Sequence, residues 1–392
     1  MKKISLFLFI LAAFISFQVA AQNFPIGHRT MNFTDIARNN RAVPTEVYYP
    51  AQTAGENTVP ASGAFPVLVF GHGFLMGYDS YFYLRDSLVP LGYILALART
   101  ETGILPNHLN FGKDLAFLVV QMKTEGNTAS SPFFGHVDST SAIMGHSMGG
   151  GASFLGCENN TVPTAMITLA AAETSPSAIS AAAHITIPSL VFSADKDCVT
   201  PPAQNQIPMY DSLASVCKVF INVKGGGHCY FADYNFTCSL GEITCQSSFT
   251  ITREQQHDVV IDFLVPYLDY YLKKIPLGWS IFADSLQSSA RISQMTLCTL
   301  SGIPGTPNPE KFAVSPNPMQ NELTVYSQGR TDRIQAMVLR TVTGSAIYSR
   351  KAGRGDCKEK ETIDFSTYQK GVYFLEVTGR KGFTSVIKLV KY

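Results

Sequence analysis

The sequence predicts an α/β fold, a mainly parallel sheet with helices on both faces, followed by a small C-terminal β-sandwich. Short apolar runs rich in Val, Ile, Leu and Phe recur through the first 300 residues with helical patterns between them, which is typical of a parallel sheet buried on both faces. Near residue 300 the composition shifts to Pro, Gly and polar residues, and the segments beyond it alternate apolar and polar positions. The 392 residues are enough for one large and one small domain.

The first 21 residues are typical of a removable export signal. Lys2 and Lys3 precede an apolar run from Ile4 to Phe17, and residues 19–21 have the small side chains that a signal peptidase requires. No later stretch reaches the roughly 18 uninterrupted apolar residues of a membrane-spanning helix. We therefore expect a soluble mature chain that is secreted or attached to the cell surface after export.

The main domain is expected at residues 22–300. Helical spacing of apolar residues predicts helices at 114–122 and 253–272, the second closing the domain. The stretch 287–300 fits either an extra helix or part of a connector. After a first pair of strands near 45–49, the expected core strands are 66–70, 93–98, 141–144, 165–169, 189–193 and 219–223.

Residues 301–310 are predicted to be a stiff polar connector, because they contain Pro and Gly and almost nothing to bury. The β-sandwich is expected at 311–392, with turns at Thr343-Gly344 and Lys381-Gly382. Its expected strands include 323–326, 336–339, 372–377 and 385–390.

The two parts differ in charge. Residues 22–304 contain 14 basic and 21 acidic side chains, whereas residues from 305 onward contain 14 basic and 8 acidic ones. Nucleic-acid binding depends on clustered Lys and Arg, so an acidic main domain argues against a nucleic-acid partner and favours neutral or apolar substrates.

Eight cysteines in an exported chain make disulfides plausible. Cys198 and Cys229 each follow a candidate catalytic residue and form the first pair to test, while Cys238 with Cys245 would close a short loop. Buried free thiols are the alternative for each pair.

Gly145-His146-Ser147-Met148-Gly149 matches G-x-S-x-G and lies between an apolar strand and a segment able to start a helix. In such an elbow the serine takes a strained conformation that lifts its hydroxyl above the sheet, and a Cβ on either glycine of the pattern would collide with the neighbouring turn. Ser147 is therefore the candidate nucleophile.

A serine nucleophile needs an imidazole base and a carboxylate, here in the chain order Ser, acid, His. The strand 189–193 runs into a polar loop with two candidates. Asp197 is favoured over Asp195 because it lies further along the loop, before the chain turns back into a helix. His228 is the candidate base, since Gly225-Gly226-Gly227 after another strand allows a tight turn that aims the ring at Ser147.

The oxyanion of an acyl-transfer transition state needs backbone donors. The N–H of Met148, after the nucleophile, is one candidate. The N–H of Phe74 in the loop after strand 66–70 is the other, with Gly73 as the alternative and His72 bonding the loop. Among the aromatic residues near both loops, Tyr230 or Phe231 is expected to line the acyl pocket.

The sequence shows no metal-ligand spacing, phosphate-binding glycine loop or dinucleotide fingerprint, so we expect hydrolysis without a metal or other cofactor.

From about residue 66 to 274 the chain resembles the α/β-hydrolase superfamily, within it the dienelactone-hydrolase-like and cutinase-like polyester hydrolases. The residues that carry the resemblance are 143–151, Asp197 before 198–201, and Gly226-Gly227-His228. It implies Ser147, Asp197 and His228 as nucleophile, acid and base, and Phe74 and Met148 as the oxyanion hole.

One departure concerns the substrate. Polyester hydrolases of this type have a tryptophan platform where this chain has residues 172–177 without one, and the only tryptophan is Trp279. This departure from the family pattern favours small esters over polymers as the substrate.

Residues 311–392 resemble the C-terminal sorting domain of type IX (Por) secretion substrates, through Val314 to Pro318, Gly371 to Phe374 and the basic end at 387–391. The resemblance implies recognition by secretion machinery at the outer membrane.

Together these observations predict a secreted serine esterase acting on small-molecule or polymeric esters through an acyl-enzyme. The alternatives are a non-catalytic surface binding protein on the same fold and a serine peptidase.

Overall fold

The computed structural model describes residues 23–298, 312–327, 333–341, 346–353, 357–380 and 384–391. The chain divides into two compact units, with the boundary between Thr306 and Pro307. The predicted export signal at 1–21, the connector at 301–310 and both predicted sandwich turns lie outside the described residues. Within the described part, no helix is both long and apolar enough to cross a membrane.

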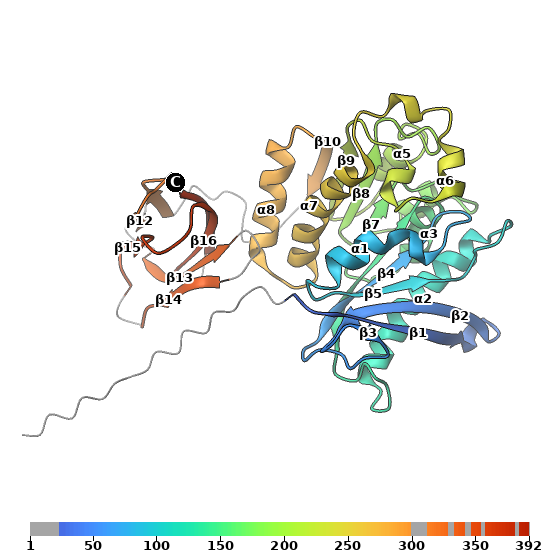
Figure 1. The fold of residues 1–392 in the computed structure, drawn as a ribbon, viewed down its shortest axis with the longest axis horizontal. Coiled ribbons are helices and arrows are strands. Elements are labelled where there is room, and N and C mark those ends of the chain that lie inside the picture. Colours follow the sequence, from blue (N-terminus) through green and yellow to red (C-terminus); the bar gives the residue numbers. More distant parts are fainter. Residues whose placement is uncertain are drawn as a thin grey trace, which may run out of the picture. The chain divides into compact units, whose positions relative to one another are not determined.

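The first unit is built on one ten-stranded sheet, with the order β10-β9-β8-β7-β6-β4-β5-β2-β1-β3 (Figure 1). Its six central strands are parallel and overlap the six predicted core strands, which confirms the predicted fold class. They are β4 (Phe65–Gly71), β5 (Ile94–Ala98), β6 (Val137–His146), β7 (Ala165–Leu169), β8 (Ser189–Ala194) and β9 (Cys217–Val223).

The edges of this sheet are mostly antiparallel. β1 (Ile26–Asp35) and β2 (Arg41–Pro50) form a hairpin through the short turn η1 (Ile36–Arg38), and β2 pairs with β5. β3 (Gly55–Glu56) lies parallel to β1, and β10 (Ile292–Cys298) pairs antiparallel with β9.

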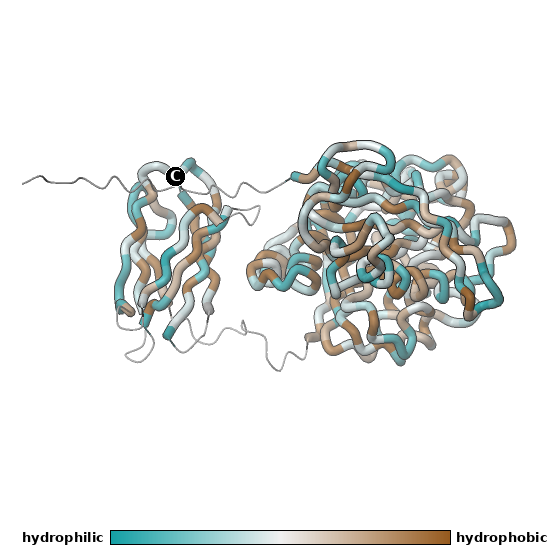
Figure 2. Tube along the Cα trace, turned by 90° about the horizontal axis from the view of Figure 1, so that it is seen from below, coloured by the Kyte–Doolittle hydropathy of each residue, from teal (hydrophilic) through white to brown (hydrophobic). Residues whose placement is uncertain are grey.

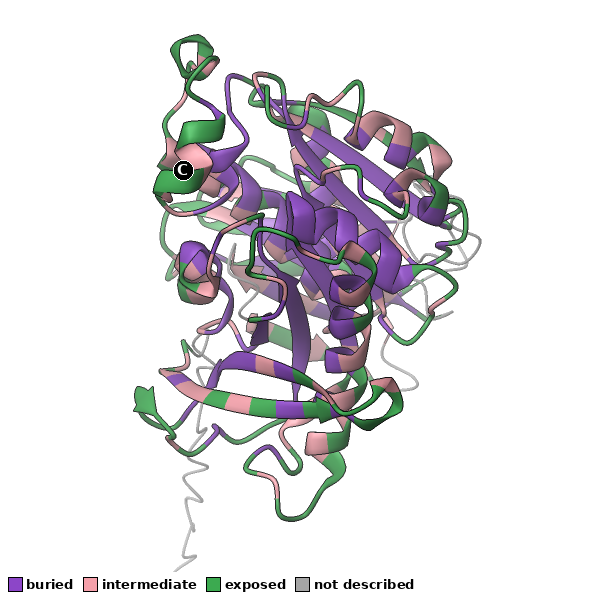
Figure 3. Cartoon of the chain, turned by 90° about the vertical axis from the view of Figure 1, so that its right-hand side faces the viewer, coloured by how far each residue is buried: buried purple, intermediate pink, exposed green. Residues whose placement is uncertain are grey.

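Two hydrophobic cores lie on opposite faces of the sheet. Along β4, Leu68 and Phe70 belong to one core and Val67 and Val69 to the other, because successive strand side chains point to opposite faces. The first core includes α1 (Phe82–Leu88), α7 (Arg253–Tyr271) and α8 (Pro276–Ser288). The second includes α2 (His108–Asn127), α3 (Met148–Cys157), α4 (Ala178–Ala182) and α5 (Gln206–Ser212). Figure 3 shows the resulting burial of the central strands.

The stretch 287–300 differs from both expectations. α8 ends at Ser288, and Ile292–Cys298 is the antiparallel edge strand β10. Only Ile292 of β10 is buried, so the strand lacks the continuous apolar pattern that revealed its neighbours.

The C-terminal unit contains two antiparallel sheets around one core, as predicted for a β-sandwich. Along its strands hydrophobic and hydrophilic residues alternate (Figure 2). One sheet is β11 (Phe312–Ser315), β12 (Glu322–Ser327) and β15 (Lys360–Asp364). The other is β14 (Ala346–Lys351), β13 (Ile334–Thr341), β16 (Gly371–Gly379) and β17 (Thr384–Lys391).

Both predicted disulfide pairings are wrong. The bonds are Cys198–Cys245, Cys229–Cys238 and Cys217–Cys298, while Cys157 and Cys357 are free. Cys198 and Cys229 bond not to each other but to Cys245 and Cys238, which belong to one segment, 236–245, that begins with α6 (Phe236–Gly241). Cys298 reaches Cys217 because β10 pairs with β9 in that register.

Candidate active site

Ser147 lies in a sharp turn between β6, which ends at His146, and α3, which begins at Met148. Its backbone angles, φ 54° and ψ −118°, are strained for a residue with a side chain. Two bonds hold the turn: Ser147 N–H donates to the Leu169 carbonyl at 3.0 Å, and Ala172 N–H donates to the Ser147 carbonyl at 2.9 Å. The strain is therefore supported by the neighbouring strand β7 and the loop after it.

The flanking glycines allow the close packing that this turn requires. A Cβ on Gly145 would overlap the Gly149 carbonyl, and a Cβ on Gly149 would overlap the Gly71 carbonyl at the end of β4. The G-x-S-x-G pattern is thus a packing requirement at both glycines.

His228 and Asp197 are brought together by the loops after β9 and β8. His228 Nδ1 lies 2.8 Å from Asp197 Oδ2, and both side chains are buried. Asp197 Oδ1 also accepts the N–H groups of Val199 and Thr200, at 2.9 and 2.8 Å. These bonds hold the carboxylate facing the ring.

Asp195 has a different environment. Its carboxylate is partly exposed, accepts the Gly225 N–H at 2.6 Å, and lies 3.8 Å from Lys196 Nζ. It connects the loops after β8 and β9 and makes no contact with His228.

Thr200 and Gln206 belong to the same buried network, although the sequence patterns indicated no role for either residue. The Thr200 hydroxyl lies 2.9 Å from Asp197 Oδ2 and 3.0 Å from His228 Nδ1, and it accepts Gln206 Nε2–H at 3.1 Å. The contact of Thr200 could have been predicted from the sequence, because Thr200 lies three residues after Asp197. The contact of Gln206 could not, because it depends on how α5 packs.

Ser147 opens onto a cavity of about 530 Å³. Ser147 Oγ has no hydrogen-bond partner among the described residues. His228 Nδ1 is bonded to Asp197, so Nε2 is the ring nitrogen without a hydrogen bond to the described residues. Hydrogen bonds between nucleophile and base are often long before substrate binds.

The two candidate oxyanion residues, Phe74 and Met148, both line this cavity. The N–H of Met148 is at the first position of α3, where no helical partner exists. The alternative donor, Gly73 N–H, already donates to the Tyr81 hydroxyl at 2.8 Å. This contact leaves Phe74 as the available donor of that loop.

Tyr230 and Phe231 do not line the cavity, contrary to the sequence expectation. Both lie in η3 (Cys229–Phe231), in which Phe231 is in the hydrophobic core with no exposed surface. Tyr230 meets Phe249 edge to face, and the Arg253 guanidinium lies over its ring. The apolar residues that line the cavity instead include Phe74, Ile104, Leu105 and Val199, whose side chains are exposed.

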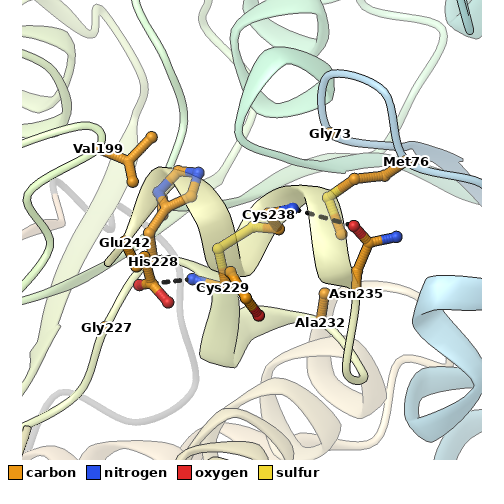
Figure 4. The surroundings of a disulfide bond; sticks show 12 residues. Gly73, Met76, Val199, Gly227, His228, Cys229, Ala232, Asn235, Cys238 and Glu242 are labelled. Atoms are coloured by element: carbon orange, nitrogen blue, oxygen red, sulfur yellow. Dashed lines mark hydrogen bonds between the residues drawn. A yellow bond between two sulfur atoms is a disulfide. The ribbon is translucent and has the colours of Figure 1, made fainter. Parts of the chain in front are cut away.

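The residue after His228 is held at three points. Glu242 accepts the Cys229 N–H at 2.9 Å, and the Cys229 side chain is bonded to Cys238 (Figure 4). Arg253 donates to the Cys229 carbonyl. Burial raises the pKa of the Glu242 carboxyl above its ordinary value. These contacts restrain the chain directly beside the ring.

The arrangement contains the parts of an acyl transfer: a serine that lines the cavity from a strained turn, a buried imidazole–carboxylate pair and two candidate backbone donors. Among the described residues, no group of three or more His, Cys, Asp or Glu side chains is arranged to hold a metal ion.

Comparisons with known proteins agree with the first resemblance. A family model described as PET hydrolase-like matches residues 19–251. Cutinase 1 of Thermobifida cellulosilytica is 34% identical over 104 residues, which cover 26% of this chain and 38% of the relative. A cutinase of Thermobifida fusca is also 34% identical over 104 residues, covering 26% and 33%.

A bis(hydroxyethyl) terephthalate hydrolase of Streptomyces coelicolor is 26% identical over 184 residues, covering 46% of this chain and 54% of the relative. The chain thus spans between a third and just over half of the length of these curated relatives.

A second family model, described as a secretion system C-terminal sorting domain, matches residues 313–392. It confirms the second resemblance and the expected export of the chain, either secreted or attached at the cell surface.

Proposed function

Since the chain belongs to the PET hydrolase-like family, we propose that it is a serine hydrolase that cleaves carboxylic esters through an acyl-enzyme on Ser147. The observations that support this most directly are the buried His228–Asp197 pair, joined at 2.8 Å, and the strained elbow that holds Ser147 at the cavity. The cutinases and the terephthalate-ester hydrolase among its relatives support the same reaction class.

In the proposed reaction, Ser147 Oγ attacks the ester carbonyl while His228 Nε2 takes its proton. Asp197 holds the other ring nitrogen and stabilises the imidazolium, and the N–H groups of Phe74 and Met148 stabilise the oxyanion. The alcohol leaves with the proton from His228. Water then attacks the acyl-enzyme with His228 as base, releasing the acid and restoring Ser147.

We expect the substrate to be a neutral ester with a small or short-chain acyl group. The exposed apolar side chains of Phe74, Ile104 and Leu105 suit an uncharged group, and Glu173 in the cavity disfavours an anionic one. The loop 172–177 contains no tryptophan on which an aromatic polymer unit would stack. A longer polyester or lipid is the less favoured substrate.

The proposed partner of the C-terminal unit is the outer-membrane secretion machinery, as the sorting-domain match suggests. Nucleic acid is not expected as a partner, because acidic residues outnumber basic ones in residues 22–304.

The direct test is Ser147→Ala, which should lower the turnover of p-nitrophenyl esters by about 10³-fold or more, because the nucleophile is lost while binding persists. Labelling by a fluorophosphonate probe should disappear as well. Ser153→Ala is the matched control, since its hydroxyl, also on α3, bonds only the Gly149 carbonyl at 2.8 Å.

Retained turnover in Ser147→Ala would contradict the proposal. A wild-type protein that neither hydrolyses esters nor reacts with the probe would instead be a binding protein on a hydrolase fold. Cleavage of peptide anilides in preference to esters would identify a peptidase.

A further inference from the structure

Two buried polar side chains between the catalytic loops have no part in the reaction described above. Tyr81 ends η2 (Tyr78–Tyr81), and His146 is the last residue of β6; neither has exposed surface. A polar group removed from water is costly unless it is hydrogen-bonded, so the partners of these two side chains indicate why they are there.

The two side chains form a continuous chain of hydrogen bonds. Gly73 N–H donates to Tyr81 Oη at 2.8 Å, Tyr81 Oη lies 3.0 Å from His146 Nδ1, and His146 Nε2 lies 3.1 Å from the His228 carbonyl oxygen. The rings of His146 and His228 are 4.8 Å apart. The chain therefore joins the loop after β4, the end of β6 and the loop after β9.

The direction of each bond follows from the chemistry of its ends. A carbonyl only accepts, so His146 Nε2 must carry its proton; Nδ1 of the neutral ring is then an acceptor, and Tyr81 donates its O–H to it. Burial lowers the pKa of His146 well below its ordinary value and raises the pKa of Tyr81. Both side chains are thus neutral near pH 7, with a single proton arrangement.

We propose that Tyr81 and His146 are positioning residues that hold the oxyanion loop, the nucleophile elbow and the base loop in register. This inference rests on the proposed function. Each residue that the hydrogen bonds connect lies next to or within a reacting residue. Gly73 precedes Phe74, His146 precedes Ser147, and the third contact is the backbone carbonyl of His228.

This hydrogen-bonded bridge, from Gly73 through Tyr81 and His146 to His228, also determines which backbone N–H groups face the substrate. Tyr81 occupies the Gly73 N–H, which fixes the His72–Gly73 peptide, one unit before the peptide that carries the Phe74 N–H, and leaves the Phe74 N–H for the oxyanion. Loss of the Tyr81 hydroxyl would free that peptide to rotate. A misplacement of about 1 Å in such a group can cost about 100-fold in rate.

The test is Tyr81→Phe, compared with Tyr83→Phe in the full-length protein. The two tyrosines are two residues apart, and the Tyr83 hydroxyl donates to the Phe231 carbonyl in η3 at 3.1 Å, so it bonds neither Gly73 nor His146. Tyr81→Phe should lower kcat for p-nitrophenyl esters by about 10- to 100-fold and change KM by less than about twofold. Fluorophosphonate labelling should slow in parallel, whereas Tyr83→Phe should keep both rates.

Variants at His146 examine the other end of the bridge. In His146→Gln the side-chain amide can still donate to the His228 carbonyl, whereas the side chain in His146→Phe has no hydrogen-bond donor. The Gln variant should therefore retain at least several-fold more kcat than the Phe variant. This comparison also serves if Tyr81→Phe does not fold.

The inference is wrong if Tyr81→Phe keeps wild-type kcat, or if Tyr83→Phe loses as much, since either result would reduce the bridge to ordinary core packing. Equal kcat in the two His146 variants would also overturn it. A wild-type protein inert to esters and probe would overturn the proposed function itself, and the inference with it.

Discussion

Asp195 and Asp197 lie two positions apart in the sequence but make different contacts. Asp197 is buried with its carboxylate against His228 and Thr200, whereas Asp195 is partly exposed and bonded to the backbone of Gly225. The sequence favours Asp197 because it lies further along the loop, where the chain turns back towards a helix. At the scale of single residues, the buried carboxylate of Asp197 is paired, as the burial of a charged group requires.

The buried neutral histidines predict acid sensitivity of the fold. Burial lowers the pKa values of His146 and His72, so in the folded state both stay neutral below about pH 6.5, where an unfolded histidine takes up a proton. Because the unfolded state then binds more protons, stability is fully present above pH 6.5 and is lost as pH falls. Each histidine contributes up to about 1.4 kcal/mol per pH unit.

His146→Gln should therefore flatten the dependence of the free energy of unfolding on pH between about 6.5 and 5, with the remaining slope due in part to His72. Urea unfolding at several pH values measures this, and the exposed His184 supplies the control variant His184→Gln. An unchanged slope in His146→Gln would show that this ring is protonated in the fold.

At the scale of elements, the segment 236–245 ties two catalytic loops together. Its disulfides reach Cys198, which follows Asp197, and Cys229, which follows His228. Glu242 within the same segment accepts the Cys229 N–H. The segment therefore restrains the proposed acid and the proposed base through their next neighbours in the chain.

Removing Cys229–Cys238 by serine substitution at both positions should lower kcat by roughly tenfold, because the base loop gains freedom beside His228. Removing Cys217–Cys298, which joins β9 to β10, should cost about 2 kcal/mol of stability but little activity. Ester kinetics and thermal melting of both variants separate these effects. An equal loss of kcat in the two would argue against a restraint specific to the base loop.

At the scale of the whole molecule, the described residues form two units with separate cores. The core of the C-terminal unit consists only of residues between Phe312 and Leu389, and the two cores on the sheet faces contain none of them. Each unit therefore buries its apolar surface within itself, as an independent domain does.

A chain ending at residue 306 should keep kcat for small esters within about twofold and melt as the first unit does in the full-length protein. The reason is that no residue of the proposed site belongs to the second unit. Kinetics and calorimetry of the two forms provide the comparison, and a large loss of kcat on truncation would show that the sorting unit contributes to catalysis.

The sequence by itself determined the features that depend on local pattern. Continuous apolar runs identified all six parallel strands, because a strand buried on both faces has no polar side, and the glycines of 145–149 indicated the elbow because no larger residue fits there. Ser147, Asp197 and His228 each follow a predicted strand, which indicated one shared site, since parallel strands end at one edge of the sheet.

Only the tertiary structure decided the contacts between segments distant in the sequence. The disulfide partners, the inward turn of Tyr230 and Phe231, the edge strand β10 and the bridge from Tyr81 through His146 to His228 all depend on which loops meet. Local propensity is read over a few neighbouring residues, whereas these contacts arise from the packing of residues up to 82 positions apart. Packing therefore selects among pairings that the local sequence leaves open.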